Sequence, residues 1–262
     1  MRRNSMRGCV EVAHGVFVAT SRKMSTNSTI LSGQGDALLI DPAWLPDELE
    51  GLAGSIRERR LTVVGGFATH AHQDHLLWHP GFGDSPRWAS AMTAELAEIE
   101  RSSLVELLGE FPEDLVNLMG RVLAVDDHIP ADSVPDGFDV EIISHNGHAP
   151  GHTALWLPRQ RVLIAGDMLS DVELPLPFYP DDLHSYMDAL DRLSPLIAKA
   201  ELVIPGHGTV GRNPAARLDA DRHYIEEMTS RGESDDLRLK NAGMAEAHAH
   251  MQRLLRKADV VG

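Results

Sequence analysis

Three imidazoles and one carboxylate stand close together in the segment Thr-His-Ala-His-Gln-Asp-His at residues 69–75. The segment directly follows the apolar run at 61–68, which predicts a strand, so the four side chains are expected on one tight turn at the carboxyl end of that strand. They are His70, His72, Asp74 and His75. Imidazole nitrogens and carboxylate oxygens suit zinc and its first-row neighbours, and without thiolates a closed cysteine-type structural site is excluded. We therefore expect an open, hydrolytic metal site at residues 69–75, which we call the metal turn.

Three later segments also place a histidine or an aspartate beside an apolar run and next to glycine. They are His148-Ala-Pro-Gly-His152-Thr153, Val162-Leu-Ile-Ala-Gly-Asp167 and Leu202-Val-Ile-Pro-Gly-His207. Glycine and Pro-Gly allow the backbone to turn sharply where a side chain must face a shared point. We expect these three loops and the metal turn to converge on one place.

In this order and spacing, the motifs His-x-His-x-Asp-His, Pro-Gly-His-Thr, Gly-Asp and Pro-Gly-His-Gly resemble those of the metallo-β-lactamase superfamily, in the branch that includes glyoxalase II-like hydrolases. The resemblance covers residues 10 to 210. It implies an α/β fold, a four-layer αββα sandwich of two mixed β-sheets covered by outer helices. Carried over by position, it implies that a first metal is held by His70, His72 and His152. The implied ligands of a second metal are Asp74, His75 and His207, with Asp167 bridging both.

The resemblance also implies two zinc ions as cofactors, with iron or manganese as possible replacements, and a small-molecule substrate. Two cations about 3.5–4 Å apart can share a water, lower its pKa and hold the resulting hydroxide opposite a carbonyl. We expect Asp74 to act in catalysis by ligating its metal and accepting a hydrogen bond from this water. The predicted function is a dinuclear metal-dependent hydrolase that uses the bridging hydroxide to cleave a thioester, ester, lactone or β-lactam.

Other functions fit the same motifs. A mononuclear iron persulfide dioxygenase keeps the ligands but fills one site, and a non-catalytic scaffold would use metal for stability alone. Phosphodiester hydrolysis, as in the tRNA-processing relatives, is disfavoured by the acidic charge. Ser170 stands where lactonases of acyl-homoserine lactones carry tyrosine, which makes that substrate less expected. The basic residues that bind glutathione in glyoxalase II cannot be identified near the C-terminus.

Composition narrows the partners and the compartment. The 262 residues carry 24 Lys and Arg against 39 Asp and Glu, a net charge of −15, which argues against nucleic acid as a partner. The single cysteine, Cys9, permits no internal disulfide. Neither a signal peptide nor a membrane span is visible, so we expect a cytoplasmic protein that does not bind membranes.

Apolar patterning predicts the elements that position these motifs within a single domain over 1–262. Short strands are expected over 10–19, 28–31 and 37–41, and a helix over 46–59. Two helices with a break at 109–112 are expected in an insert at about 91–120, which either covers the site or forms an ordinary outer layer. The runs starting at 122, 140, 154 and 162 are predicted to form the second sheet. A helix over 182–200, a strand over 201–204 and C-terminal helices at about 213–258 complete the chain.

Several further side chains have two interpretations. Asp41 either orients the metal turn, as acidic residues outside a ligand shell do, or serves a local turn. Trp78 and Phe82 either wall a substrate pocket or fill the core. His79 is interpreted as a loop residue, and Tyr179 and Tyr186 as structural residues with hydroxyls able to meet a substrate. His145 and His148 precede His152; His148 is the one expected near the metals, but ligation is assigned to the histidine after Pro-Gly. His223, His248 and His250 are interpreted as surface residues.

Overall fold

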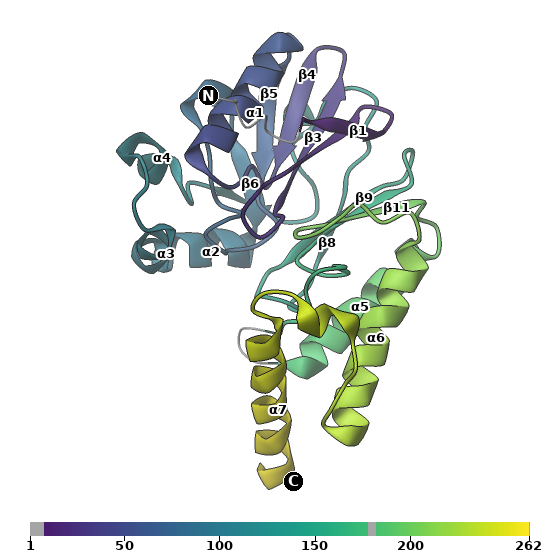
Figure 1. The fold of residues 1–262 in the computed structure, drawn as a ribbon. Helices are drawn as coiled ribbons and strands as arrows, with labels where there is room; N and C mark the ends of the chain where they lie inside the picture. The colour runs from purple at the N-terminus through teal and green to yellow at the C-terminus, as the bar shows by residue number, and fades with distance from the viewer. Residues whose placement is uncertain (1–7, 178–181, 262) are drawn as a thin grey trace, which may run out of the picture.

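The computed structural model describes residues 8–177 and 182–261, and two β-sheets form its centre (Figure 1). The larger sheet has seven strands in the order β1-β2-β3-β4-β5-β6-β7. Their bounds are β1 (Val10–Ala13), β2 (Val16–Thr20), β3 (Asn27–Gly33), β4 (Asp36–Ile40), β5 (Thr62–Phe67), β6 (Arg87–Ser90) and β7 (Leu123–Val125). The first four strands pair antiparallel and the last four parallel, so the sheet is mixed.

The smaller sheet has four strands in the order β11-β10-β9-β8. They are β8 (Glu141–Ser144), β9 (Thr153–Leu157), β10 (Val162–Gly166) and β11 (Leu202–Pro205). The expectation that the run at 122–125 belongs to this sheet is wrong, because β7 pairs parallel with β6 at the far edge of the larger sheet. A short apolar run carries no signal for which sheet it joins.

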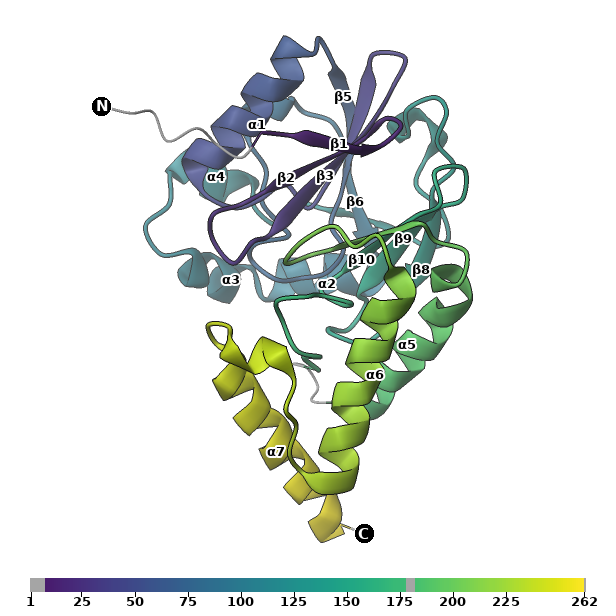
Figure 2. The same cartoon turned by 45° about the vertical axis from the view of Figure 1, so that its right-hand side comes forward.

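Helices cover the outer face of each sheet (Figures 1 and 2). The larger sheet carries α1 (Pro46–Glu58), α2 (Ala91–Ile99), α3 (Arg101–Leu108) and α4 (Glu113–Leu118), and the smaller carries α5 (Leu183–Ile197) and α6 (Pro214–Arg231). The last helix, α7 (Met244–Val261), contacts α6 and lies below the smaller sheet in Figure 1. Short 3-10 helices lie at η1 (Pro80–Phe82), η2 (Ala131–Ser133) and η3 (Leu237–Lys240). The expected break at 109–112 is present, but the chain also ends a helix at Ile99, which gives three helices in the insert.

Alternation along each strand builds three apolar layers. In β4, Leu38 and Ile40 face the smaller sheet, whereas Ala37 and Leu39 face α1. In β10, Val162 and Ile164 face the larger sheet, whereas Leu163 packs with α5 and α6. One core therefore lies between the sheets and one beneath each helical layer. This is the predicted four-layer αββα sandwich.

The two sheets are hydrogen-bonded to each other at the edge that carries the metal turn. The Asn27 N–H donates to Gly206 O at 2.7 Å, and the Asn27 side chain donates to Pro205 O at 2.8 Å. On the neighbouring side, the Thr153 N–H donates to Thr69 O at 2.8 Å. These bonds bring loops of both sheets to one place.

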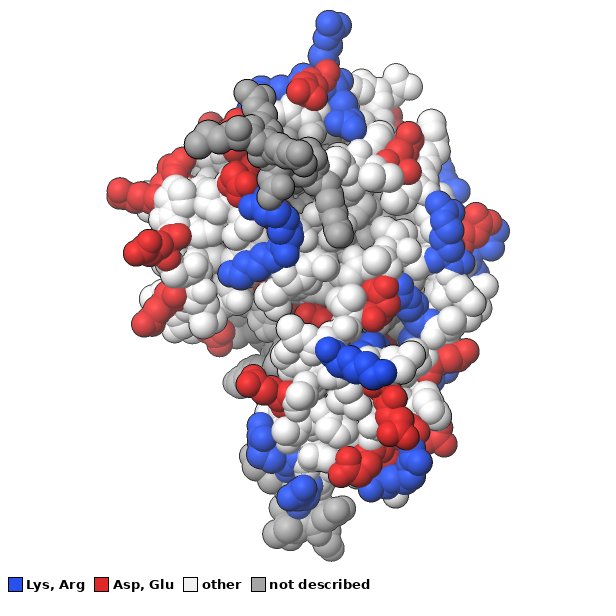
Figure 3. All heavy atoms as spheres, viewed as in Figure 1, with Lys and Arg blue, Asp and Glu red and all other residues white. Residues whose placement is uncertain are grey.

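Charged side chains of both signs share the surface, and the length and composition of the helices bear on whether the chain could span a membrane. On the face drawn in Figure 3, Lys and Arg side chains are interspersed with Asp and Glu. Among the described residues, no helix combines the length and the apolar composition that crossing a membrane requires.

Candidate metal centre

The metal turn follows the end of β5 and is held from below by a buried carboxylate. Asp41 accepts the Thr69 N–H at 2.8 Å and the Thr69 hydroxyl at 2.7 Å. Its Oδ2 also lies 2.9 Å from His75 Nδ1. Asp41 is 2 % exposed and therefore orients the turn and one of its imidazoles, as the first of its two interpretations holds.

A first group of side chains joins two residues of the metal turn to two later loops. His70 Nε2 and His148 Nε2 lie 2.9 and 3.1 Å from His72 Nδ1. Asp167 Oδ2 lies 3.4 Å from His70 Nε2 and 3.5 Å from His148 Nε2. These four atoms converge from three segments and could hold one metal ion.

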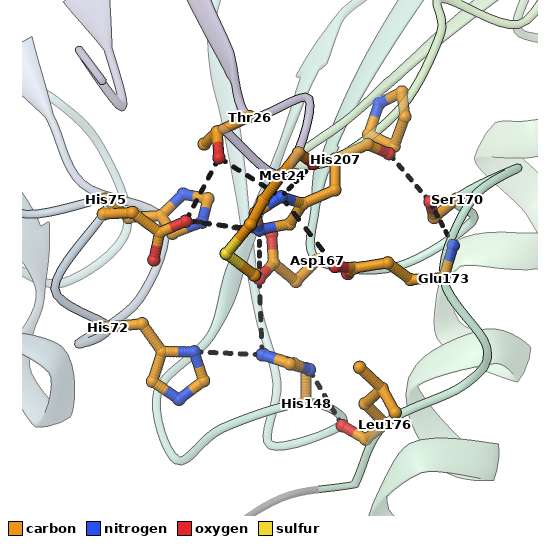
Figure 4. Close-up of polar contacts among 12 residues, drawn as sticks. Met24, Thr26, His72, His75, His148, Asp167, Ser170, Glu173, Leu176 and His207 are labelled. Atoms are coloured by element: carbon orange, nitrogen blue, oxygen red, sulfur yellow. Dashed lines mark hydrogen bonds and ion pairs between the residues drawn. The ribbon is translucent and has the colours of Figure 1, made fainter. Parts of the chain in front are cut away.

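A second group lies beside the first and uses the same aspartate (Figure 4). His207 Nε2 is 3.3 Å from Asp74 Oδ2 and 3.3 Å from Asp167 Oδ2. His75 Nε2 is 3.5 Å from Asp74 Oδ2 and 3.2 Å from Asp167 Oδ1. Asp74, His75 and His207 could hold a second ion, and Asp167 faces both groups.

Oxygen atoms outside the groups orient most of the imidazoles. His148 Nδ1 donates to Leu176 O at 2.8 Å, and His207 Nδ1 donates to Met24 O at 3.0 Å (Figure 4). His70 Nδ1 lies 3.0 Å from the Thr69 hydroxyl oxygen, whose own proton is donated to Asp41. When such a ring is neutral and keeps its proton on Nδ1, its Nε2 offers a lone pair to the group, which is the state that binds a metal.

His152 lies outside both groups, although the motif comparison assigned it to the first. Its Nε2 accepts the backbone N–H of Asp167 at 3.0 Å, so that lone pair is used. Its Nδ1 faces His145 Nε2 at 3.3 Å, and the two rings stack with centroids 4.7 Å apart. The structure thus brings together six of the seven predicted residues and puts His148 where His152 was expected.

Two glycines allow Asp167 to reach this position. A Cβ at Gly206 would overlap the Asp167 carboxylate. Gly166 has φ +54°, and a Cβ there would overlap the His152 ring. The glycine beside each polar residue in the motifs therefore serves close approach as well as turning.

The two groups differ in how their surroundings shift the pKa values of the rings. Burial lowers the pKa of His148 to about 3 and holds the pKa of His70 well below its usual value. Burial acts in the same direction on His207, but the carboxylates of Asp167 and Glu173 outweigh it and raise the pKa to about 10. The pKa of His75 is likewise raised, because Asp167, Asp74 and Asp41 outweigh its burial.

The donor set fits a metal ion better than it fits a self-contained hydrogen-bond network. His75 Nε2 and Asp167 Oδ1 are buried and, within the described part of the chain, make no hydrogen bond although they lie 3.2 Å apart. A buried polar atom without a partner is costly unless another ligand satisfies it. Both atoms point into the shared centre, where a cation would satisfy them.

The other candidate side chains serve the fold. Trp78 and Phe82 are buried in the core beneath α1. His79 caps η1 and pairs with Glu50. Tyr186 is buried with its hydroxyl 3.5 Å from Asp221, and Tyr179 lies outside the described residues.

Sequence reasoning missed Glu173, whose carboxylate lies 3.9 Å from His207 Nδ1 and within reach of Asp167. No motif marks it, because it follows Asp167 in an irregular loop. His148 had a usable signal: it lies four residues before His152 in the same glycine-containing loop, so both histidines were candidates for the ligand from that loop.

The αββα layers, with histidines and aspartates gathered at one edge, define a class of metal-binding α/β proteins. The family model described as the metallo-beta-lactamase superfamily matches residues 22–207, and the chain belongs to this superfamily. It is 28 % identical over 167 residues to the beta-lactamase-like protein 2 homolog of Caenorhabditis elegans, a match that covers 63 % of this chain and 51 % of that protein. The chain thus spans about half the length of that relative.

Two further likenesses agree with this membership. The chain is 26 % identical over 193 residues to the hydroxyacylglutathione hydrolase GloC of Haemophilus influenzae, with 70 % of this chain and 84 % of that protein covered. A beta-lactamase domain protein from Burkholderia ambifaria shares the fold with a TM-score of 0.69 at 19 % identity, over 97 % of this chain and 90 % of that one.

Proposed function

We propose that the protein is a hydrolase with two metal ions, zinc in the first instance, that cleaves a carboxylic-acid derivative. The proposal rests on one observation: Asp167 faces two adjacent groups of buried nitrogen and oxygen atoms. His70, His72 and His148 would hold one ion, Asp74, His75 and His207 the other, and Asp167 both. We assign His148 to the first ion in place of His152, a choice supported by the position of His148 Nε2 beside His72 and Asp167.

When bound, metal ions in such a site polarise a carbonyl and lower the pKa of a shared water. The water oxygen bonds to the carbonyl carbon, the bond to the leaving oxygen, sulfur or nitrogen breaks, and the water proton ends on that atom. Asp74 lines the cavity beside the metal turn, and Thr26 donates its hydroxyl to Asp74 Oδ2 at 3.3 Å. Asp74 is therefore held where it can accept a hydrogen bond from the attacking water.

Purified protein assayed against chromogenic esters, thioesters, lactones and a β-lactam tests this function. We expect turnover of at least one substrate class, loss of turnover with a chelator, and recovery when zinc is restored. Two metal ions per chain are expected by elemental analysis. One iron per chain with consumption of oxygen by a persulfide would instead support the dioxygenase. Metal that raises thermal stability without any turnover would support the scaffold.

A further inference from the structure

A cavity of about 1020 Å³ opens beside the metal turn, and α3 and α7 contribute to its walls. His72, Asp74, Asp167 and His207 line the part next to the metal turn. Leu107 of α3 lines it on one side, and Ala247 and His250 of α7 line it on another. Figure 2 shows where α3 and α7 lie in the fold. His250, which was expected on the surface, is half-buried and lines this cavity.

Away from the metal turn, the walls are largely apolar. Leu176 and Met244 are buried at the cavity, and Ala247 is partly buried beside them. Met24 and Leu107 are 53 % and 64 % exposed and both line the cavity. Large apolar side chains left exposed around a cavity mark a surface that contacts an apolar ligand.

The charge of the walls disfavours an anionic ligand in this part of the cavity. Among the described lining residues, Lys240 is the one Lys or Arg. Glu173 and Glu246 line the same cavity, in addition to the aspartates of the metal groups. An anionic group lodged between the helices would meet Glu246 against Lys240, with Glu173 beside the metal groups, so these walls offer no net positive charge to offset its lost hydration.

The C-terminal segment, which forms one wall of the cavity, is hydrogen-bonded to the loop that carries Asp167. Arg238 of η3 is 6 % exposed, and its Nη1 donates to Ser170 O and Glu173 O, each at 3.1 Å. The same guanidinium pairs with Asp221 of α6. Asn241 donates to Val172 O at 2.8 Å. These contacts, of which those of Arg238 with Ser170 O and Asp221 are buried, hold the wall in place.

Resting on the hydrolase function above, we propose that the substrate carries an extended, uncharged, apolar acyl group. The acyl chain lies along Leu107, Leu176 and Ala247, and its carbonyl lies at the metal groups. The structure thereby assigns a specificity-determining role to α3 and α7, which the family motifs do not reach.

Binding of the product acids tests this proposal independently of turnover. Calorimetry on zinc-loaded protein measures the Kd of acetate, hexanoate and octanoate, and kcat/KM is measured for the matching p-nitrophenyl esters. Affinity is expected to rise about two- to fourfold for each buried methylene. Octanedioate, which adds a second carboxylate to the octanoate chain, is expected to bind at least about tenfold more weakly than octanoate.

Pairs of matched variants test which residues form the apolar wall that sets the preference for octanoate over acetate. Ala247→Phe fills the wall, and the preference for octanoate over acetate is expected to fall about tenfold or more. Ala245→Phe, on the same helix but outside the cavity lining, keeps the preference. Leu107→Asn lowers it and Ile99→Asn, an equally exposed site on α2, does not.

Equal binding of acetate and octanoate, or octanedioate as tight as octanoate, would overturn the proposal even if esters are hydrolysed. Chain-length-dependent binding without hydrolysis of any ester, thioester or lactam would uphold the apolar chain site and overturn the hydrolase function. Loss of the octanoate preference in Ala245→Phe as strongly as in Ala247→Phe would also contradict the assignment.

Discussion

The two ligand groups share Asp167 but hold their protons differently. In the first group burial dominates, so that the pKa values of His70 and His148 are low and the rings are neutral. In the second group the carboxylates dominate, and the pKa values of His75 and His207 are raised. The first group is thus ready to bind a cation, whereas the second must release protons first.

This difference follows from where the carboxylates lie. Asp41 and Asp74 each lie within ion-pair distance of a His75 ring nitrogen, and Glu173 lies within ion-pair distance of His207. In the first group, Asp167 lies within ion-pair distance of the ring nitrogens of His70 and His148. Two adjacent metal sites in one protein can therefore differ in how their affinity for an ion depends on pH.

Asp167→Ala removes the carboxylate that the two groups share. We expect it to have the largest effect on kcat/KM and on metal content. Loss of a residue that only orients a ligand costs about 10–100-fold in metal affinity or activity, so loss of the shared ligand should cost more than about hundredfold in kcat/KM. Metal content measured by mass spectrometry should fall below two per chain. Asp139→Ala, an exposed surface control, should keep both values. Retention of two ions and full turnover in Asp167→Ala would refute the shared role.

His148→Ala and His152→Ala separate the geometry from the motif comparison. His148→Ala removes a ligand of the first group, so this group should no longer retain zinc after dialysis. His152→Ala removes the acceptor of the Asp167 N–H and the ring that stacks on His145, and about a 10–100-fold loss of affinity is expected. Competition with a chromogenic chelator measures both. A larger loss of zinc affinity in His152→Ala than in His148→Ala would instead support His152 as the ligand.

Asp41→Asn should weaken the second group more than the first, because Asp41 contacts His75 Nδ1 directly. Zinc affinity of the second site is expected to fall about 10–100-fold. Titration with zinc should then show a first equivalent bound nearly as before and a weakened second one. A uniform loss of both equivalents would indicate that Asp41 supports the whole turn through Thr69.

Proton release on metal binding should differ between the two equivalents at pH 7. With a pKa of about 3, His148 has no proton to lose from its ligating nitrogen, whereas His207, with a pKa raised to about 10, must lose one. Affinity for the second ion should therefore rise with pH up to about 10. Calorimetry in buffers of different ionisation enthalpy counts these protons. If the first and the second metal ion release equal numbers of protons on binding, the proposed pKa difference between the two groups is contradicted.

The fold and most of the centre could be predicted because short, local patterns encode them. The spacing of His70, His72, Asp74 and His75 on one turn needs no knowledge of the distant chain. Helix α1 was expected to within one residue of its observed end, because its apolar spacing and its charged first turn agree. The superfamily motifs then supplied the sandwich architecture.

What could not be predicted depends on which distant groups meet. The choice between His148 and His152 is decided by the Asp167 N–H, which occupies the lone pair of His152. The strand at 123–125 joins the larger sheet through pairing with β6, which has no signature in its own residues. Glu173 and His250 line one cavity although they lie far apart in the chain, and Arg238 joins the C-terminal segment to the Asp167 loop by donating to Glu173 O.

A crystal structure of the zinc-loaded protein, with anomalous maps at the zinc edge, tests the central claim most directly. We expect two peaks about 3.5–4 Å apart with Asp167 between them. The first should lie about 2.0–2.1 Å from nitrogens of His70, His72 and His148, and the second at similar distances from His75 and His207. A single peak distant from Asp167, or a peak coordinated by His152 with His148 turned away, would contradict the account.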